Sequence, residues 1–160
     1  DCVIRTGALP EDGVIARPLG KLTMVNCASP HYLTRFGYPQ SPDDLTSHAI
    51  VRYTPHLGVH PLGFEVASVN GVQWFKSGGM LTVNSSENYL TAGLAGLGII
   101  QIPRIAVREA LRAGRLIEVL PGYRAEPLSL SLVYPQRREL SRRVNLFMQW
   151  LAGVMKEYLD

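Results

Sequence analysis

The fold is decided by residues 83–103, which read VNSSENYLTAGLAGLGIIQIP. Asn84 is a good helix N-cap, and Glu87 stands three residues later, where a capping box places its acid. Apolar residues then recur at helical spacing as far as Leu97. The run 99–102 is apolar enough for a parallel strand buried on both faces. The stretch therefore predicts a βαβ unit.

The turn of this unit contains Asn84, Ser85 and Ser86. Here the carboxyl end of a strand meets the N-terminus of a helix, whose free N–H groups and dipole favour small anions. Ligands of open α/β sheets usually bind at this edge. The same residue types also occur in turns that only cap a helix. The turn alone leaves both interpretations open.

Strands and short helices alternate along the rest of the chain, which indicates an α/β fold. Ser29 and Pro30 begin a second helix, so the turns at Ser29 and Asn84 could face one another across a cleft. The pair Asn70-Gly71 predicts a hairpin. The other predicted strands span 2–5, 14–19, 22–27, 49–53, 116–120 and 128–134, and the other helices 104–113 and 140–159.

The last helix has a wide apolar face. Its spacing predicts a buried stripe of Val144, Phe147, Met148, Leu151, Met155 and Tyr158. Leu146 and Trp150 lie beside this stripe and either widen the core or form a subunit contact.

Composition bounds the class of protein. The chain has 160 residues, 46% of them hydrophobic and 18% charged, which fits one globular domain or two small lobes. A net charge of +3 is too weak to indicate nucleic-acid binding by this stretch. No apolar run approaches the roughly 20 residues of a membrane span. Because residue 1 runs directly into a strand, we expect the stretch to belong to a longer protein.

Residues with reactive side chains form no recognisable catalytic or metal motif. Cys2 and Cys27 match no C-x-x-C pattern and indicate structural thiols in a reducing compartment, or a redox switch if their strands are adjacent. His56 and His60 are spaced as a helical metal pair, but Pro and Gly between them favour a loop. The glycines form no phosphate loop, and no G-x-S-x-G elbow occurs. We therefore expect no enzyme, no metal and no cofactor.

Several segments in a fixed order resemble the effector-binding domain of LysR-type transcriptional regulators. They are DCVIRTG (1–7), VIARPLG (14–20), MVNCASPHYL (24–33), SPDDLTSHAIVRY (41–53), VNSSENYLTAGLAGLGIIQIP (83–103), AGRLIEVLP (113–121) and LSLVYPQRRELSRRVNLFMQWL (130–151). The resemblance covers nearly the whole chain.

This resemblance implies an α/β, periplasmic-binding-protein-like fold with two lobes. Residues 1–28 and 128–160 would form lobe I, and 29–127 lobe II. The first βαβ unit of lobe I and the preceding DNA-reading helix-turn-helix are absent from the sequence, so lobe I would be incomplete. Its open sheet edge and uncovered apolar surface would make the chain, alone, self-associate or be only marginally stable.

The resemblance also implies effector contacts. They would lie at Arg5, Thr6 and Gly7, at Asn84, Ser85 and Ser86, at Ile100, Gln101 and Pro103, and at the crossover residue Ser29. Arg5 could pair with a carboxylate or be a solvated charge at a strand end.

The implied role is effector sensing in a cytoplasmic transcription factor, with a small molecule, which could be a carboxylate, bound in the cleft between lobes. Its other partners would be a second copy, as homodimer or homotetramer, and DNA, reached through the missing helix-turn-helix and not through this stretch. The basic cluster of Arg137, Arg138, Arg142 and Arg143 is then a solvated helix end or a subunit contact. The alternative is a solute-binding protein of a transport system with the same fold.

Overall fold

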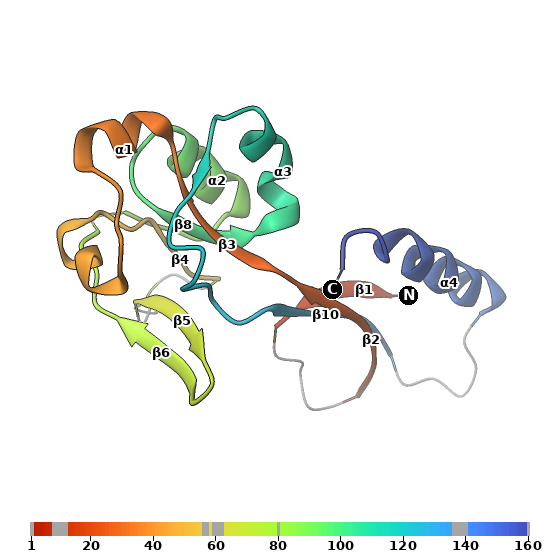
Figure 1. Cartoon of the computed structure of the whole chain (residues 1–160). Coiled ribbons are helices and arrows are strands. Elements are labelled where there is room, and N and C mark those ends of the chain that lie inside the picture. Colours follow the sequence, from red (N-terminus) through yellow and green to blue (C-terminus); the bar gives the residue numbers. More distant parts are fainter. Residues whose placement is uncertain are drawn as a thin grey trace. The chain divides into compact units, whose positions relative to one another are not determined.

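A computed structural model describes residues 2–7, 13–55, 58, 63–79, 81–135 and 141–159. The chain forms two compact units (Figure 1). The first contains Asp1–Thr23 and Pro127–Asp160, and the second contains Met24–Glu126. The assignment of residues to lobes I and II stays a prediction.

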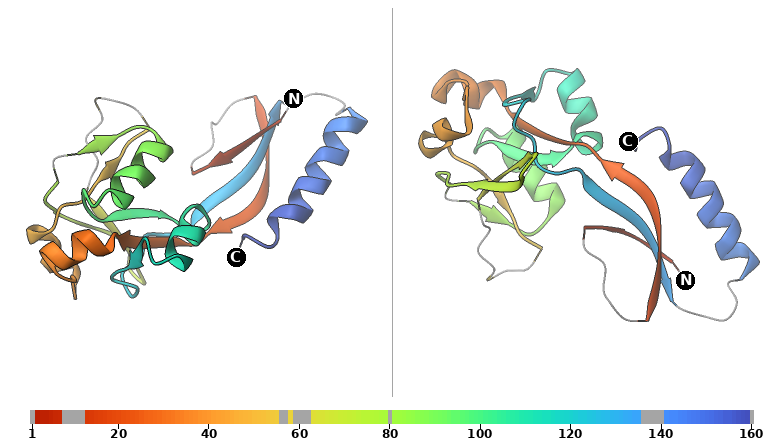
Figure 2. Two further views of the ribbon diagram at one scale, coloured as in Figure 1. Left: turned by 90° about the horizontal axis from the view of Figure 1, so that it is seen from above. Right: turned by 60° about the horizontal axis from the view of Figure 1, so that its bottom comes forward.

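The first unit is a three-stranded antiparallel sheet with one helix on it (Figure 2). Its strands, in spatial order, are β1 (Val3–Thr6), β10 (Leu128–Pro135) and β2 (Val14–Leu22). Met148 and Leu151 of α4 (Arg142–Met155) pack with Leu132 of β10 to form a small core. The central strand β10 therefore buries its middle residues, while β1 is exposed along its length.

A β-bulge replaces the strand break predicted between residues 19 and 22. Strand β2 continues from Val14 to Leu22, although its register against β10 shifts by one residue. Leu130 pairs with Gly20 and Ser131 pairs with Pro18, so Leu19 is the extra residue. Gly20 lies next to the bulge, where a residue without a side chain lets the strand bend without ending it. The prediction that the strand ends at this glycine was therefore wrong.

The buried face of α4 is narrower than the predicted stripe. Met148 and Leu151 are buried, and Val144 and Met155 are partly buried, as predicted. Phe147 and Tyr158 are instead 47% and 39% exposed, because the sheet of this unit contacts only one side of the helix.

The second unit combines a small mixed sheet with a hairpin and several helices (Figure 1). Its strands are β3 (Met24–Ala28), β4 (Arg52–Tyr53), β5 (Phe64–Ser68), β6 (Gly71–Phe75), β7 (Thr82–Val83), β8 (Ile100–Pro103) and β9 (Ile117–Glu118). Its helices are α1 (Pro30–Phe36), the 3₁₀ helix η1 (Pro42–Ser47), α2 (Ser86–Leu94) and α3 (Arg104–Arg112). Hairpin β5–β6 turns at Asn70-Gly71, where Gly71 takes a φ of 103°.

The predicted βαβ unit is present, with another strand between its two strands. β7 pairs in parallel with β4, and Val51 of the β4 segment in turn donates its N–H to the carbonyl of Ile99 at 3.0 Å. After Ile99 the chain turns into β8, which pairs antiparallel with β3. The expectation that 99–102 is a buried parallel strand was therefore right about its burial and wrong about most of its pairing.

Two hydrophobic clusters hold the second unit together. One lies under α2 and α3 and contains Val25, Cys27, Val51, Ile100 and Val107. The other lies under α1 and the hairpin and contains Tyr32, Leu45, Phe64, Ile99 and Val119. Ile99 and Ile100 belong to different clusters, as do Ile50 and Val51, so this sheet is covered on both faces.

A buried histidine ties η1 to α1 and makes stability depend on pH. His48 is 5% exposed, and its Nδ1 lies 3.0 Å from the hydroxyl of Tyr32, which accepts the N–H of Ala49 at 2.9 Å. Burial lowers the pKa of His48, and the carboxylate of Asp44 opposes this only in part. The unfolded chain therefore takes up a proton near pH 6.5 that the folded chain resists.

We expect this contribution to stability to be complete above pH 6.5 and to be lost as the pH falls below that value. The free energy of unfolding, measured by urea denaturation, should fall less between pH 7 and pH 5 in His48→Gln than in the unsubstituted chain. His31→Gln, on the exposed side of α1, should keep the full pH dependence. The same pH dependence in both variants would contradict this account.

Candidate functional site

The turn between β7 and α2 is the first candidate site. Ser85 is the N-cap of α2, since its Oγ accepts the N–H of Asn88 at 3.4 Å. The prediction of Asn84 as the cap, with Glu87 completing a capping box, was one residue too early. Asn84 and Ser86 are exposed on either side of the cap.

The surroundings of this turn keep the geometry that favours a ligand. Thr54 follows β4 and donates its N–H to the carbonyl of Val83 at 2.9 Å, so two parallel strands end side by side. Only Asn84 and Ser85 lie between the end of β7 and the first residue of α2. An anion placed at Asn84 to Ser86 would meet free backbone N–H groups at this edge.

Ser29 does not belong to the same site. It is 3% exposed, and its Oγ caps α1 by accepting the N–H of Tyr32 at 3.2 Å. A Cβ added at Gly96, the glycine that follows α2, would lie only 3.1 Å from this Oγ, so Ser29 and Gly96 are close neighbours. Ser29 therefore lies at the C-terminal end of α2 and Asn84 precedes its N-terminal end, roughly 13 Å away for nine helical residues. The two turns do not face one another, because one helix separates them.

Gln101 has its side-chain amide occupied by neighbouring residues of the second unit. Its Nε2 donates to Asn26 Oδ1 at 2.9 Å and to the carbonyl of Glu65 at 2.7 Å. Its Oε1 accepts the N–H of Glu65 at 3.0 Å, and its own N–H donates to the hydroxyl of Tyr89 at 2.9 Å. The amide thus pairs with Glu65 as a neighbouring strand would and fastens the hairpin to β8.

Ile100 and Pro103, the two other residues predicted as contacts on this strand, contribute to the core and to strand pairing. Ile100 is completely buried in the cluster under α2, so its side chain presents no surface to a ligand. Pro103 ends β8, pairs with Met24 and directly precedes α3.

The remaining predicted residues lie in the first unit. Arg5 and Thr6 are exposed on β1, opposite Ser131 and Leu130. Gly7 takes a φ of 79° and donates its N–H to the carbonyl of Ser129 at 3.0 Å. The three residues form one short segment at the end of β1, with Arg5 and Thr6 exposed and Gly7 half-buried.

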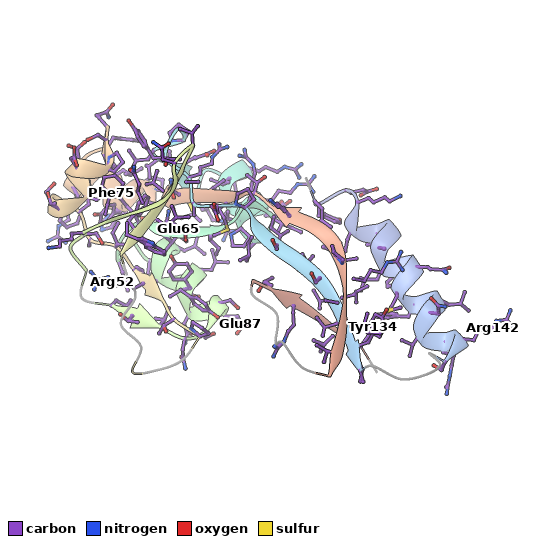
Figure 3. The ribbon with its side chains drawn as sticks, turned by 90° about the horizontal axis from the view of Figure 1, so that it is seen from below. Arg52, Glu65, Phe75, Glu87, Tyr134 and Arg142 are labelled. Atoms are coloured by element: carbon purple, nitrogen blue, oxygen red, sulfur yellow. The ribbon has the colours of Figure 1, made fainter. Side chains whose placement is uncertain are left out.

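The second unit also contains a pocket of about 320 Å³ that sequence analysis did not identify. It lies between the end of β4, the hairpin and α2, and its lining includes the charged residues Arg52 and Glu65, which are labelled in Figure 3. Thr54 and Gln101 are further polar residues of the lining. The rings of Tyr53 and Tyr89 meet at 5.7 Å between centroids, and Trp74 supplies a third aromatic surface. Burial raises the pKa of Tyr89, which therefore stays protonated. An arginine within the apolar run AIVRY was the one sequence signal for this pocket.

The two cysteines that sequence analysis considered for a redox switch lie in different units and different surroundings. Cys27 is completely buried on β3, which pairs with β8 and β9, whereas Cys2 is partly exposed next to β1, which pairs with β10. Among the described residues their strands therefore do not pair with one another, which was the condition for the switch. Burial raises the pKa of the Cys27 thiol to about 12.

Because the thiolate is the reactive form, we expect iodoacetamide at pH 8 to modify Cys2 and to leave Cys27 unmodified in the folded chain. Peptide mass spectrometry measures both sites, and denaturation in urea should make both react. Comparable labelling of the two sites in the folded chain would show that the second unit opens readily around β3.

Two further predictions fall partly or wholly outside the described residues. His56 and His60 are not among them, nor are Arg137 and Arg138, while Arg142 and Arg143 are exposed in the first turn of α4. Within the described part of the chain, no group of three or more His, Cys, Asp or Glu side chains is arranged to hold a metal ion. No helix in that part is long and apolar enough to cross a membrane.

Comparison with known proteins identifies relatives of this fold. Residues 1–156 match the family model described as LysR substrate binding domain. An HTH-type transcriptional repressor of Pseudomonas aeruginosa is 33% identical, with 98% of this chain and 50% of that protein covered. The HTH-type transcriptional activator AaeR of Escherichia coli is 31% identical, with the same coverage. The chain spans about half the length of these relatives.

A solved structure gives the same result. The regulatory domain of CrgA, a LysR-type transcriptional regulator from Neisseria meningitidis, superposes with a TM-score of 0.82 at 26% identity. The alignment covers 96% of this chain and 74% of that domain.

Fold and relatives together define a periplasmic-binding-protein-like, two-lobed α/β domain of the kind that binds effectors. The chain belongs to the LysR substrate-binding domain family, and the relatives and the solved structure reported above are transcriptional regulators. These relatives favour an effector-binding role over that of a transport solute-binding protein.

Proposed function

We propose that this chain senses a small-molecule effector and passes the result to the DNA-binding domains of the same regulator. The observation that supports this most is the turn at Asn84 to Ser86. This turn connects β7 to the N-terminus of α2, beside the end of the parallel strand β4. The relatives of the chain are transcriptional regulators. In this role the chain binds its effector without catalysis and acts in the cytoplasm, where its DNA lies.

Effector binding would act by shifting an equilibrium between arrangements of the domain. A ligand can favour one arrangement only by binding it more tightly than the other. The free N–H groups at the α2 N-terminus belong to the second unit, so contacts made there are available to bias that equilibrium.

The experiment is a promoter-reporter assay with the full-length regulator carrying Ser86→Ala, which leaves the Ser85 cap intact, and the double variant Ser85→Ala with Ser86→Ala. The effector concentration for half-maximal response should rise about tenfold for each lost ligand hydrogen bond. Ser129→Ala, an exposed serine of β10, is the matched control. An unchanged response in the double variant would refute the site. Sequencing the gene on both sides of this stretch tests separately whether the protein contains a DNA-binding module.

We further propose that the regulator assembles from several copies and that the outer face of α4 takes part. Leu146, Trp150 and Val154 follow one another at four-residue spacing and are 57%, 61% and 42% exposed. Aromatic and aliphatic side chains in such a patch are typical of protein contacts. Sedimentation velocity should show self-association that Leu146→Lys with Trp150→Lys reduces; a monodisperse unsubstituted monomer would refute it.

A further inference from the structure

Strand β6 is the free edge of the β5–β6 hairpin. Its partner β5 turns its other edge toward the rest of the second unit. There the N–H and C=O of Glu65 both bond the side chain of Gln101, at 3.0 and 2.7 Å, and the N–H of Ala67 bonds the carbonyl of Arg124 at 2.8 Å. Within the described part of the chain, β5 is the only strand that pairs with β6.

The register of the hairpin shows which backbone groups of β6 point outward. Opposite residues of an antiparallel pair either bond each other or both turn their N–H and C=O groups away from the partner strand. Glu65 and Ala67 turn theirs away from β6, and they lie opposite Trp74 and Val72. Val72 and Trp74 therefore direct two N–H and two C=O groups out of the free edge, where no described residue binds them.

This edge lacks the features by which proteins usually keep strand edges unpaired. Such features are charged side chains, proline, bulges and coverage by other elements. The stretch 66–75, VASVNGVQWF, contains no charged residue and no proline, and the register of the hairpin has no bulge. A two-stranded hairpin is also marginally stable, so a further strand would stabilise it.

The free edge matches a second copy of itself. An antiparallel pair centred on Gln73 places Val72 opposite Trp74 of the second copy, and Trp74 opposite its Val72. Both members of each pair direct their backbone groups outward, so the two pairs together can form four hydrogen bonds. Each pair also joins a β-branched to an aromatic side chain, a combination that stabilises antiparallel sheets. A register shifted by one residue would oppose outward and inward groups and form no such pair.

We propose that the free edge of β6 is an interface between two copies of this chain. The two hairpins join into one four-stranded antiparallel sheet, in the order β5-β6-β6-β5, about a twofold axis at Gln73. One short strand buries much less than the roughly 800 Å² per partner of a standard interface, so the contact is weak on its own. It strengthens wherever a second contact holds the copies together. The interface belongs to the second unit and stands whether or not α4 takes part in assembly.

Disulfide trapping tests the interface and its register. In a pair centred on Gln73 the two Cα atoms of residue 73 lie about 4.5 Å apart, a separation that a disulfide spans. Gln73→Cys is made in a Cys2→Ser background, where the remaining Cys27 is completely buried, and oxidised glutathione is added. Val69→Cys, in the fully exposed turn of the same hairpin, is the matched control. Gln73→Cys should form linked dimers about tenfold or more faster than Val69→Cys.

A second variant separates strand pairing from random collision. Val72→Pro removes one outward N–H and none of the β5–β6 hydrogen bonds, and proline is tolerated on the free edge of a sheet. Added to Gln73→Cys, it should lower the rate of dimer formation to that of Val69→Cys. Hydrogen exchange of the unsubstituted chain reads the same contact, because the amides of Val72 and Trp74 should exchange more slowly as the protein concentration rises.

Equal rates for Gln73→Cys and Val69→Cys, no dimer from Gln73→Cys, or a rate that Val72→Pro leaves unchanged would each overturn the interface. If Val72→Pro does not fold, the comparison of positions 73 and 69 decides without it. Amides of Val72 and Trp74 that are slowed only by an added protein of different sequence would assign the edge to that protein and overturn the second copy as its occupant. Trapping at position 73 in the α4 double variant would support this interface independently of α4.

Discussion

Replacing Asn26 with alanine is expected to lower the free energy of unfolding by about 3–5 kcal/mol. Asn26 is completely buried on β3. Its Nδ2 donates to the carbonyls of Leu120 and Tyr123, at 3.2 and 2.9 Å, and its Oδ1 accepts from Gln101 at 2.9 Å. Alanine would leave one buried and one partly buried carbonyl without this donor and remove one acceptor of Gln101.

The backbone at Leu120 increases this effect. Leu120 has a φ of 48°, a left-handed conformation that costs a residue with a side chain about 1–2 kcal/mol. The turn from Leu120 to Tyr123 is held by its own 2.9 Å hydrogen bond and by the Asn26 amide. Without the amide, the strained turn would lose its main contact with β3.

Urea unfolding followed by circular dichroism and tryptophan emission measures the change. Asn88→Ala, an exposed asparagine in the first turn of α2, is the matched control and should change stability by less than about 0.5 kcal/mol apart from helix propensity. Similar stabilities of the two variants would mean that water replaces the Asn26 amide.

Local chemistry explains which elements were predictable from the sequence. Ser29-Pro30 specifies a helix start and Asn70-Gly71 a hairpin turn, each through its own backbone preferences. Both elements occur where they were predicted. At 84–85 the same chemistry could not distinguish two good caps, and the helix begins after the second.

Pairing between distant segments explains what was not predictable. Nothing in residues 99–102 tells whether they pair with β3 or with the β4 segment, and Gly20 is equally compatible with a strand end and a bulge. The pocket has the same difficulty, since Arg52, Trp74 and Tyr89 come from β4, β6 and α2. The sequence therefore led to the right fold and to the turn at Asn84–Ser86, while the pocket required the structure.

Replacing Gln101 with leucine tests whether this residue holds the hairpin in place or only contacts an effector. The family resemblance implied that Gln101 contacts the effector, whereas the structure gives its amide three hydrogen bonds to Glu65 and Asn26. Leucine has a similar size but no polar atoms, so the edge of β5 would lose its partners. We expect Gln101→Leu to destabilise the ligand-free chain by about 2–4 kcal/mol.

Hydrogen exchange locates the effect. The amide of Glu65 donates to Gln101 Oε1, so its protection should fall in the variant while the helical amides of α3, packed against the opposite cluster, keep theirs. Gln73→Leu, an exposed glutamine on β6 of the same hairpin, is the matched control. If Gln101 served only to contact an effector, the ligand-free variant would keep its stability within about 0.5 kcal/mol and its Glu65 protection.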